Sequence, residues 1–148
     1  FTALGTQSSA ATIPVTLEQT IKNGVSEKIA GFVIPLCGTI HLAGSIMKIT
    51  ACAMALMILE GMPIDFTVFV GFIFMLGIVM VAAPGVPGGA IMAAVGVLQS
   101  MMGFNEEMIG LMIALYIAMD SFGTACNVTG DGAIALVVDE ITKEKMAA

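Results

Sequence analysis

The chain has 148 residues, of which 58% are hydrophobic and 11% are charged, and its formal net charge is −6. Soluble domains carry about 25% charged residues, so this composition indicates closely packed helices in a membrane. The negative charge and the absence of arginine from the sequence exclude a basic surface for nucleic acid.

Residues 1–21 contain a small polar cluster, TQSSAAT at 6–12, followed by Pro14 and a mildly amphipathic run to Ile21. Their apolar portion is too short to cross about 30 Å of hydrocarbon. We predict the first hairpin here, a helix–turn–helix that dips into the membrane and returns. The start lacks an initiator Met and a signal segment, so we expect the chain to be the C-terminal part of a longer protein.

Residues 29–59 form the longest apolar run, interrupted by Pro35, Gly38 and Gly44. A continuous helix over this run would reach about 46 Å, more than the membrane core requires. We therefore predict a transmembrane helix with an unwound middle.

Residues 66–100 have the pattern of a second hairpin. Residues 66–83 are apolar or Thr, and PGVPGG at 84–89 stops the helix before a short apolar stretch at 90–98. The tip of this hairpin is predicted at 85–89, and it must face protein or a water-filled cavity because lipid does not tolerate exposed irregular backbone.

Residues 106–141 are predicted to form one last helix. Within it Asp120, Thr124, Asn127 and Asp131 follow one another at spacings of four, three and four, which puts them on one face. A carboxylate in the middle of a membrane helix costs roughly 2.5–3.5 kcal/mol, which indicates a functional site. Such oxygens suit a hard cation or an ammonium group; the alternative is a stripe that only joins helices by hydrogen bonds.

The predicted fold is thus an all-α membrane protein with two re-entrant helical hairpins and two long transmembrane helices, one of them broken. Paired interrupted segments are typical of secondary transporters with a site near the membrane midplane. Gated channels also use re-entrant loops, so a non-concentrative channel is an alternative. We do not predict an enzyme, because Ser8 and Ser9 have no base near them in sequence.

Four segments carry a family resemblance in the expected order. They are QSSAATIP at 7–14, PLCGTIHLAGS at 35–45, APGVPGG at 83–89 and the stretch 120–131, which ends in the specific run NVTGD. Together they resemble the dicarboxylate/amino acid:cation symporters, the glutamate-transporter family. The resemblance implies the core of an elevator-type transport domain in the cell membrane, crossing it several times. It also implies a scaffold domain outside this chain through which the protein forms a homotrimer.

The resemblance implies a role for individual residues in substrate binding. Asp120 would accept the ammonium group of an amino acid, and Asn127 with the backbone at Ser8 and Ser9 would hold its carboxylate. The tip between Val86 and Gly88 would be the gate. The other implied substrate-binding residues are Ser45, Gly123 and Thr124.

It also implies two sodium sites and no organic cofactor. Asp131 would ligate one sodium ion with carbonyls around Cys37 and Asn127. Thr39, the Leu42 carbonyl and carbonyls near residues 80–83 would frame another.

Two departures from the family pattern bear on the substrate and on coupling. Relatives that transport acidic amino acids have Arg where this chain has Gly123, so a second substrate carboxylate would lie unpaired, costing several kcal/mol. We therefore predict a neutral amino acid, or a related zwitterion such as cystine, and expect Gly123 to leave room for a larger side chain. Ala43 replaces an Asp, which removes the carboxylate of a deep third cation site.

His41 and Lys48 are the candidates for a role in coupling. His41 is either a satisfied interior imidazole or a group that couples transport to a proton gradient instead of sodium. Lys48 is either surrounded by water at the helix break or a tethered ammonium that replaces the lost cation. Because these positions are altered, a substrate-binding membrane sensor remains a further alternative.

Overall fold

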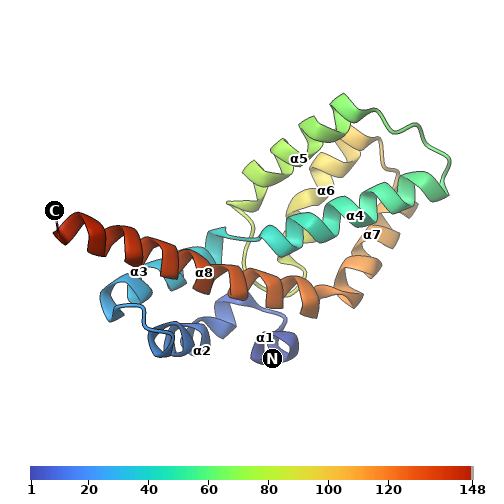
Figure 1. Ribbon diagram of the computed structural model, residues 1–148. Coiled ribbons are helices and arrows are strands. Elements are labelled where there is room, and N and C mark those ends of the chain that lie inside the picture. The colour runs from blue at the N-terminus through green and yellow to red at the C-terminus, as the bar shows by residue number, and fades with distance from the viewer. Residues whose placement is uncertain (148) are drawn as a thin grey trace.

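The computed structural model of the protein describes residues 1–147, which form helices joined by turns and loops and include no strand. Figure 1 shows α4 to α7 on one side of the molecule and α1 to α3 with α8 on the other. The helices in chain order are α1 (Thr2–Thr6), α2 (Ser9–Lys22), α3 (Glu27–Ile40), α4 (Ala43–Leu59), α5 (Phe66–Met80), α6 (Gly89–Met102), α7 (Glu106–Ala118) and α8 (Asp120–Ala147).

Each of the two sides has its own apolar core. The larger core lies among α4 to α7, where Phe72, Leu76 and Met112 are fully buried. The smaller core lies among α2, α3 and the second half of α8, with Ile34 and Ala135 fully buried. The polar first turns of α8 lie at the junction of the two cores.

The first hairpin is a helix–turn–helix, as predicted for residues 1–21. Ser8 starts α2 because its Oγ accepts the backbone N–H of Ala11 at 3.1 Å, the usual role of a serine N-cap. Gln7, the residue before it, has φ 52°, in the left-handed region that residues other than glycine rarely adopt. The reversal between α1 and α2 is therefore built from two residues.

The long run 29–59 is broken in its middle, as predicted. Pro35 and Gly38 remain inside α3, and Gly44 lies inside α4. The helix is interrupted at His41 and Leu42, whose ψ angles of 94° and 41° are not helical. The interruption thus lies in the middle of the run, between Gly38 and Gly44, and none of the three helix-disfavouring residues is itself at the break.

The second hairpin has its arms in α5 and α6, packed side by side (Figure 1). Residues 81–88 connect them, close to the predicted tip. A Cβ on Gly89 would lie 2.3 Å from the Pro84 carbonyl oxygen, so only glycine fits the start of α6. Gly88 has φ +73°, which also favours glycine.

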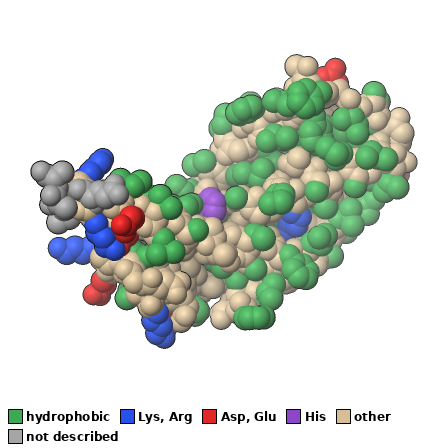
Figure 2. Space-filling view, in the orientation of Figure 1, with side chains coloured by type: hydrophobic (Ala, Val, Ile, Leu, Met, Phe, Trp, Pro, Cys, Tyr) green, Lys and Arg blue, Asp and Glu red, His purple; other side chains and the backbone are tan. Residues whose placement is uncertain are grey.

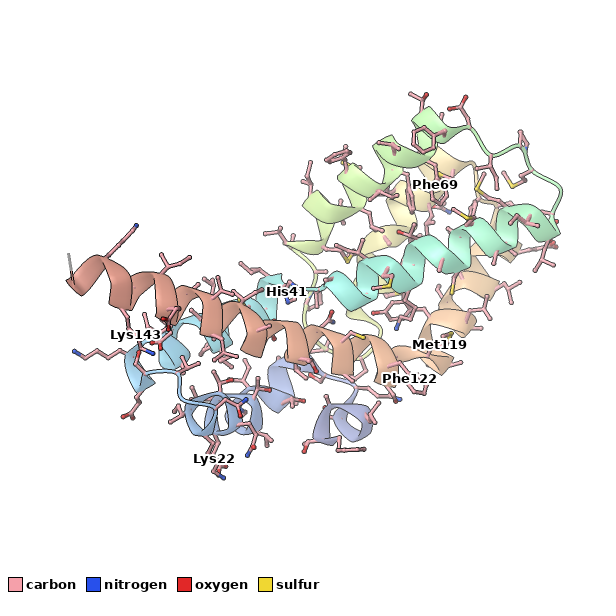
Figure 3. The ribbon with its side chains drawn as sticks, viewed as in Figure 1. Lys22, His41, Phe69, Met119, Phe122 and Lys143 are labelled. Carbon is pink, nitrogen blue, oxygen red and sulfur yellow. The ribbon has the colours of Figure 1, made fainter. Side chains whose placement is uncertain are left out.

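The prediction of a single last helix is wrong, because α7 and α8 meet at a bend of 61°. The bend is at Met119, which lies in Figure 3 where the two helices join. Lys48 Nζ donates to the carbonyl oxygen of Tyr116 at 3.2 Å, in the last turn of α7. A side chain that binds such a carbonyl disturbs the helical hydrogen-bond ladder, and this is a recognised cause of kinks.

The surface and the helix lengths both bear on a membrane location. One stretch, Glu27–Leu59, is long and apolar enough to cross a membrane, and the bent pair α7–α8 adds a second if it is counted as one span. Phe66, Phe74 and Ile78 of α5 are exposed. Figure 2 shows hydrophobic side chains over the α4–α7 side, whereas most of the charged side chains visible in this view lie near the C-terminal end of the chain. An apolar surface of this extent indicates contact with lipid or further protein.

Candidate substrate and cation site

The polar stripe of α8 faces the interior of the protein. Asp120, Thr124, Asn127 and Asp131 are all buried, with exposed fractions between 1% and 4%. The prediction that these four side chains share one protected face is confirmed. They face the break between α3 and α4 and the tips of both hairpins, so three interrupted segments converge on one helix.

Asp120 takes part in a buried ion pair. Its Oδ1 accepts a hydrogen bond from Lys48 Nζ at 2.9 Å, and its Oδ2 accepts the backbone N–H of Gly88, in the tip of the second hairpin, at 2.9 Å. Lys48 Nζ also lies 3.3 Å from the centroid of the Tyr116 ring, a cation–π contact. Lys48 is only 8% exposed. Lys48 is therefore engaged with protein groups on α7 and α8.

Glycines allow the lysine to approach the aspartate. A Cβ on Gly44 of α4 would lie 2.5 Å from the carbonyl oxygen of Gly123 on α8, so the two backbones are nearly in contact. A Cβ on Gly123 would lie 3.1 Å from Lys48 Nζ. The space beside Gly123, expected to hold a larger substrate side chain, is thus bordered by the ammonium group of Lys48.

Asn127 is part of a second network at the start of α4. Its Oδ1 accepts the backbone N–H of Gly44 at 2.8 Å, and its Nδ2 donates to Ser45 Oγ at 3.2 Å. Ser45 Oγ also accepts the hydroxyl of Tyr116 at 3.1 Å. These bonds fix the amide of Asn127 and align the first turn of α4 against α8.

The two hairpin tips contact each other beside this network. Ser8 Oγ donates to the carbonyl oxygen of Gly85 at 2.8 Å, and the backbone N–H of Ala10 donates to the same oxygen at 3.1 Å. A cavity of about 10 Å³ remains between the tips and α8. Its lining includes Ser9, Leu42, Ser45, Val86, Asp120, Thr124 and Asn127. Most of the residues predicted to bind the substrate therefore surround one small hollow.

Asp131 lies farther along α8 and has a different basic partner. His41 Nδ1, at the break of the long helix, is 2.7 Å from Asp131 Oδ1. Figure 3 shows His41 between α3 and α4, beside α8. A Cβ on Gly130 would lie 2.5 Å from His41 Cε1, so the ring needs this glycine to reach the carboxylate.

The residues predicted to hold sodium are only partly brought together. Cys37 is buried in the smaller core, and Leu42 lies at the helix break. Thr39 is exposed, and its hydroxyl donates to the Leu36 carbonyl of its own helix at 2.7 Å, away from the stripe. The described residues include no group of three or more His, Cys, Asp or Glu that could hold a metal ion. A sodium ion at Asp131 would thus depend on backbone carbonyls for its other ligands.

Sequence reasoning missed two contributors to the site. Tyr116, the only tyrosine, supplies a ring and a carbonyl to Lys48 and a hydroxyl to Ser45. It lies four residues before Asp120, so the spacing of the polar stripe extends to it. The carbonyl of Gly85 was also missed, because main-chain acceptors leave no sequence pattern.

Comparison with known proteins agrees with this geometry. Residues 1–141 match the family described as the sodium:dicarboxylate symporter family. This chain belongs to that family. A membrane location, predicted from composition, follows from the membership, and the prediction that the chain is not an enzyme is confirmed, since the family consists of symporters.

Individual members of the family are about equally similar to the chain. It is 30% identical over 146 residues to excitatory amino acid transporter 5 of Mus musculus, covering 98% of the chain and 26% of that protein. It is 31% identical over 148 residues to the serine/threonine transporter SstT of Acinetobacter baylyi, covering 96% and 36%. Neutral amino acid transporter B(0) of Rattus norvegicus is 30% identical over 131 residues, covering 88% and 23%. The chain thus spans about a quarter to a third of the length of these relatives.

Proposed function

We propose that this chain is the binding core of a secondary transporter that couples inward movement of a neutral amino acid to a sodium gradient. The observation that supports this most strongly is the convergence of both hairpin tips and the helix break on the buried carboxylate of Asp120. A buried carboxylate surrounded by polar groups suits an ammonium group, which binds through charge-assisted hydrogen bonds. The alternatives from the sequence are a channel and a binding sensor.

The dimensions of the hollow require a gate. At about 10 Å³ it holds no more than a water molecule, so a tip must move aside to admit an amino acid. The tip of the second hairpin is the better candidate, since Val86 is 50% exposed and Gly88 is bound to Asp120 by a single backbone hydrogen bond. Ser8 and Ser9 lie on the opposite tip, where their backbone can approach the carboxylate of the substrate.

A neutral amino acid, or a related zwitterion such as cystine, fits the charges of the site. Asp120 and Lys48 bring one negative and one positive charge, so a zwitterion leaves the site electrically balanced. An acidic amino acid would add an unbalanced negative charge to a buried site. Two of the relatives described above are named for serine/threonine and for neutral amino acids.

Coupling to sodium is proposed from the family and from the chemistry at Asp131. Its carboxylate oxygens, with backbone carbonyls around Cys37 and Asn127, are the hard ligands that such a cation prefers, and the Leu42 carbonyl with Thr39 is proposed to belong to a second sodium site. The whole protein is proposed to be a multi-pass homotrimer in the cell membrane. In it the two hairpins re-enter the membrane, and the transport domain moves against a scaffold outside this chain.

The test is uptake by the full-length protein in proteoliposomes. With an inward sodium gradient, we expect a neutral amino acid to accumulate above its external concentration. Equilibration without accumulation would indicate a channel, and binding without uptake would indicate a sensor. Accumulation driven by a proton gradient in sodium-free buffer would replace sodium as the coupling ion.

Gly130→Ala tests the proposed sodium site. The added Cβ would displace the His41 ring, leaving the buried Asp131 without its partner. We expect a loss of about 1.5–3 kcal/mol of stability in sodium-free buffer, and a larger stabilisation by sodium than in the native protein. Thermal unfolding in sodium and in choline chloride measures both.

The matched control is Gly132→Ala on the same helix, where the added Cβ would meet Thr20 Oγ1 at an ordinary 3.6 Å. Equal sodium responses of the two variants would remove Asp131 from the sodium site.

A further inference from the structure

We infer that Lys48 is a specificity-determining residue that receives the carboxylate of the transported amino acid when Asp120 turns to the substrate's ammonium group. The inference rests on the proposed function and names a residue to which neither the family resemblance nor the sequence pattern gives a part in substrate binding. In this exchange, one internal ion pair becomes two ion pairs with the substrate.

The first step concerns Asp120, whose two oxygens are both engaged. Lys48 Nζ binds Oδ1, and the Gly88 N–H binds Oδ2. An ammonium group arriving at this carboxylate would place a second cation beside Lys48 in a buried setting. The two cations repel each other strongly where water is excluded. Movement of the Gly88 tip frees Oδ2 for the ammonium group, and the repulsion between the two neighbouring cations then favours release of Lys48 from Oδ1.

The second step concerns the displaced lysine. A buried ammonium group without a partner is strongly unfavourable, so Lys48 must find another anion. The groups that face it from α7 and α8 are the Tyr116 ring and carbonyl, Asp120 and the backbone at Gly123, and Asp120 is the only anion among them. The other four lysines of the chain are exposed. An amino acid brings its own carboxylate on the same carbon atom as its ammonium group, so it supplies the missing anion.

The third step concerns the room for this movement. Lys48 lines a cavity of about 230 Å³ together with Gly44, Met47, Phe122 and Gly123, whereas Asp120 lines the small polar hollow between the tips. The ion pair thus joins two spaces, and the flexible stem of a lysine can turn within the larger one. The amide of Asn127 is already engaged with Gly44 and Ser45, and Lys48 is the one cationic side chain among the described residues that lines either space, so it can add an ion pair to the contacts proposed for the backbone at Ser8 and Ser9.

The alternative is an ion pair that only holds α4 against α8. The two interpretations differ in what they predict for a ligand that lacks the carboxylate. An amine made by removing the carboxyl group of the amino acid would displace Lys48 without giving it a partner. Under the exchange, the preference for amino acid over amine depends on Lys48; under a purely structural role, it does not.

The experiment measures binding of the amino acid that the full-length protein transports best and of its decarboxylated amine. It compares the native protein, Lys48→Met and Lys48→Arg by calorimetry. We expect the native protein to prefer the amino acid by about a hundredfold or more. Lys48→Met should lose most of this preference, with amine binding unchanged or stronger, whereas Lys48→Arg should retain it.

A second pair of variants keeps the test decisive if Lys48→Met does not fold. Gly123→Ala would bring a Cβ to 3.1 Å from Lys48 Nζ and restrict the lysine, so we expect a reduced preference, whereas Gly132→Ala should behave as native.

An undiminished preference in Lys48→Met, or in Gly123→Ala, overturns the inference and leaves the proposed function standing. A native protein that binds no amino acid overturns both.

Discussion

Asp120→Asn is expected to abolish substrate binding and to lower the free energy of unfolding by about 3–5 kcal/mol. The amide keeps the shape of the carboxylate but loses its charge. Lys48, buried at 2.9 Å from Asp120, is then left without an anionic partner, because the Asn oxygen and the Tyr116 ring and carbonyl are uncharged. Thermal unfolding and uptake of the full-length variant measure the two effects.

The double variant Asp120→Asn/Lys48→Met separates these effects. Removing the unpaired ammonium should restore most of the stability, because a buried ion pair can often be replaced by uncharged groups of similar volume. Binding should stay abolished, since no carboxylate remains for the ammonium group of the substrate. Native uptake by either variant would show that Asp120 is not the receptor.

Among Gly→Ala substitutions in the site, Gly44→Ala is expected to be the most damaging. It should lower the free energy of unfolding by about 3 kcal/mol or more. The added Cβ would lie 2.5 Å from the Gly123 carbonyl oxygen and 2.7 Å from the Cβ of Cys126. The positions of both atoms are fixed by the backbone of α8, so neither can move aside by rotation of a side chain. The separation of α4 and α8 should also pull Lys48 from Asp120 and reduce binding.

Gly77→Ala on α5 is the control, because nothing lies within 4 Å of its added Cβ. Its free energy of unfolding should rise by no more than about 1 kcal/mol, because alanine has a higher helix propensity than glycine. Equal unfolding temperatures of Gly44→Ala and Gly77→Ala would show that the close approach of α4 and α8 does not contribute to stability.

Local patterns were sufficient to predict the hairpin arms, the broken long helix and the buried stripe of α8. The stripe depends on the spacing of its residues, the second hairpin on the stop signal at Pro84, and the broken helix on the length of the run 29–59 and the residues that interrupt it. The bend at Met119 could not be predicted in this way, because Lys48 reaches the Tyr116 carbonyl across 68 positions of the chain. Without that contact, the residues around position 119 give no reason to expect a bend rather than a straight helix.

The ion-pair partners of the charged residues could not be predicted from the sequence either. Lys48 and His41 were recognised as unusual, but their carboxylates lie 72 and 90 positions away. The hypothesis that Lys48 substitutes for the cation lost at Ala43 named no partner for its ammonium group. The partner is Asp120 on α8, and the approach depends on Gly44 and Gly123, which have no side chains to suggest a contact.

The contact between the hairpin tips has a consequence for how quickly the protein can work. The acceptor is a main-chain carbonyl at Gly85, where a side chain would collide with the Gly38 carbonyl oxygen at 2.8 Å, so the acceptor half of the contact tolerates little variation. The donor half consists of the Ser8 hydroxyl and the backbone N–H of Ala10, and only the hydroxyl can be changed by substitution. A hydrogen bond contributes about 1 kcal/mol, equivalent to roughly a fivefold change in an equilibrium constant. Evolution can therefore adjust the lifetime of the closed tips, and with it the turnover rate, at a single residue that leaves the charges of the site unchanged.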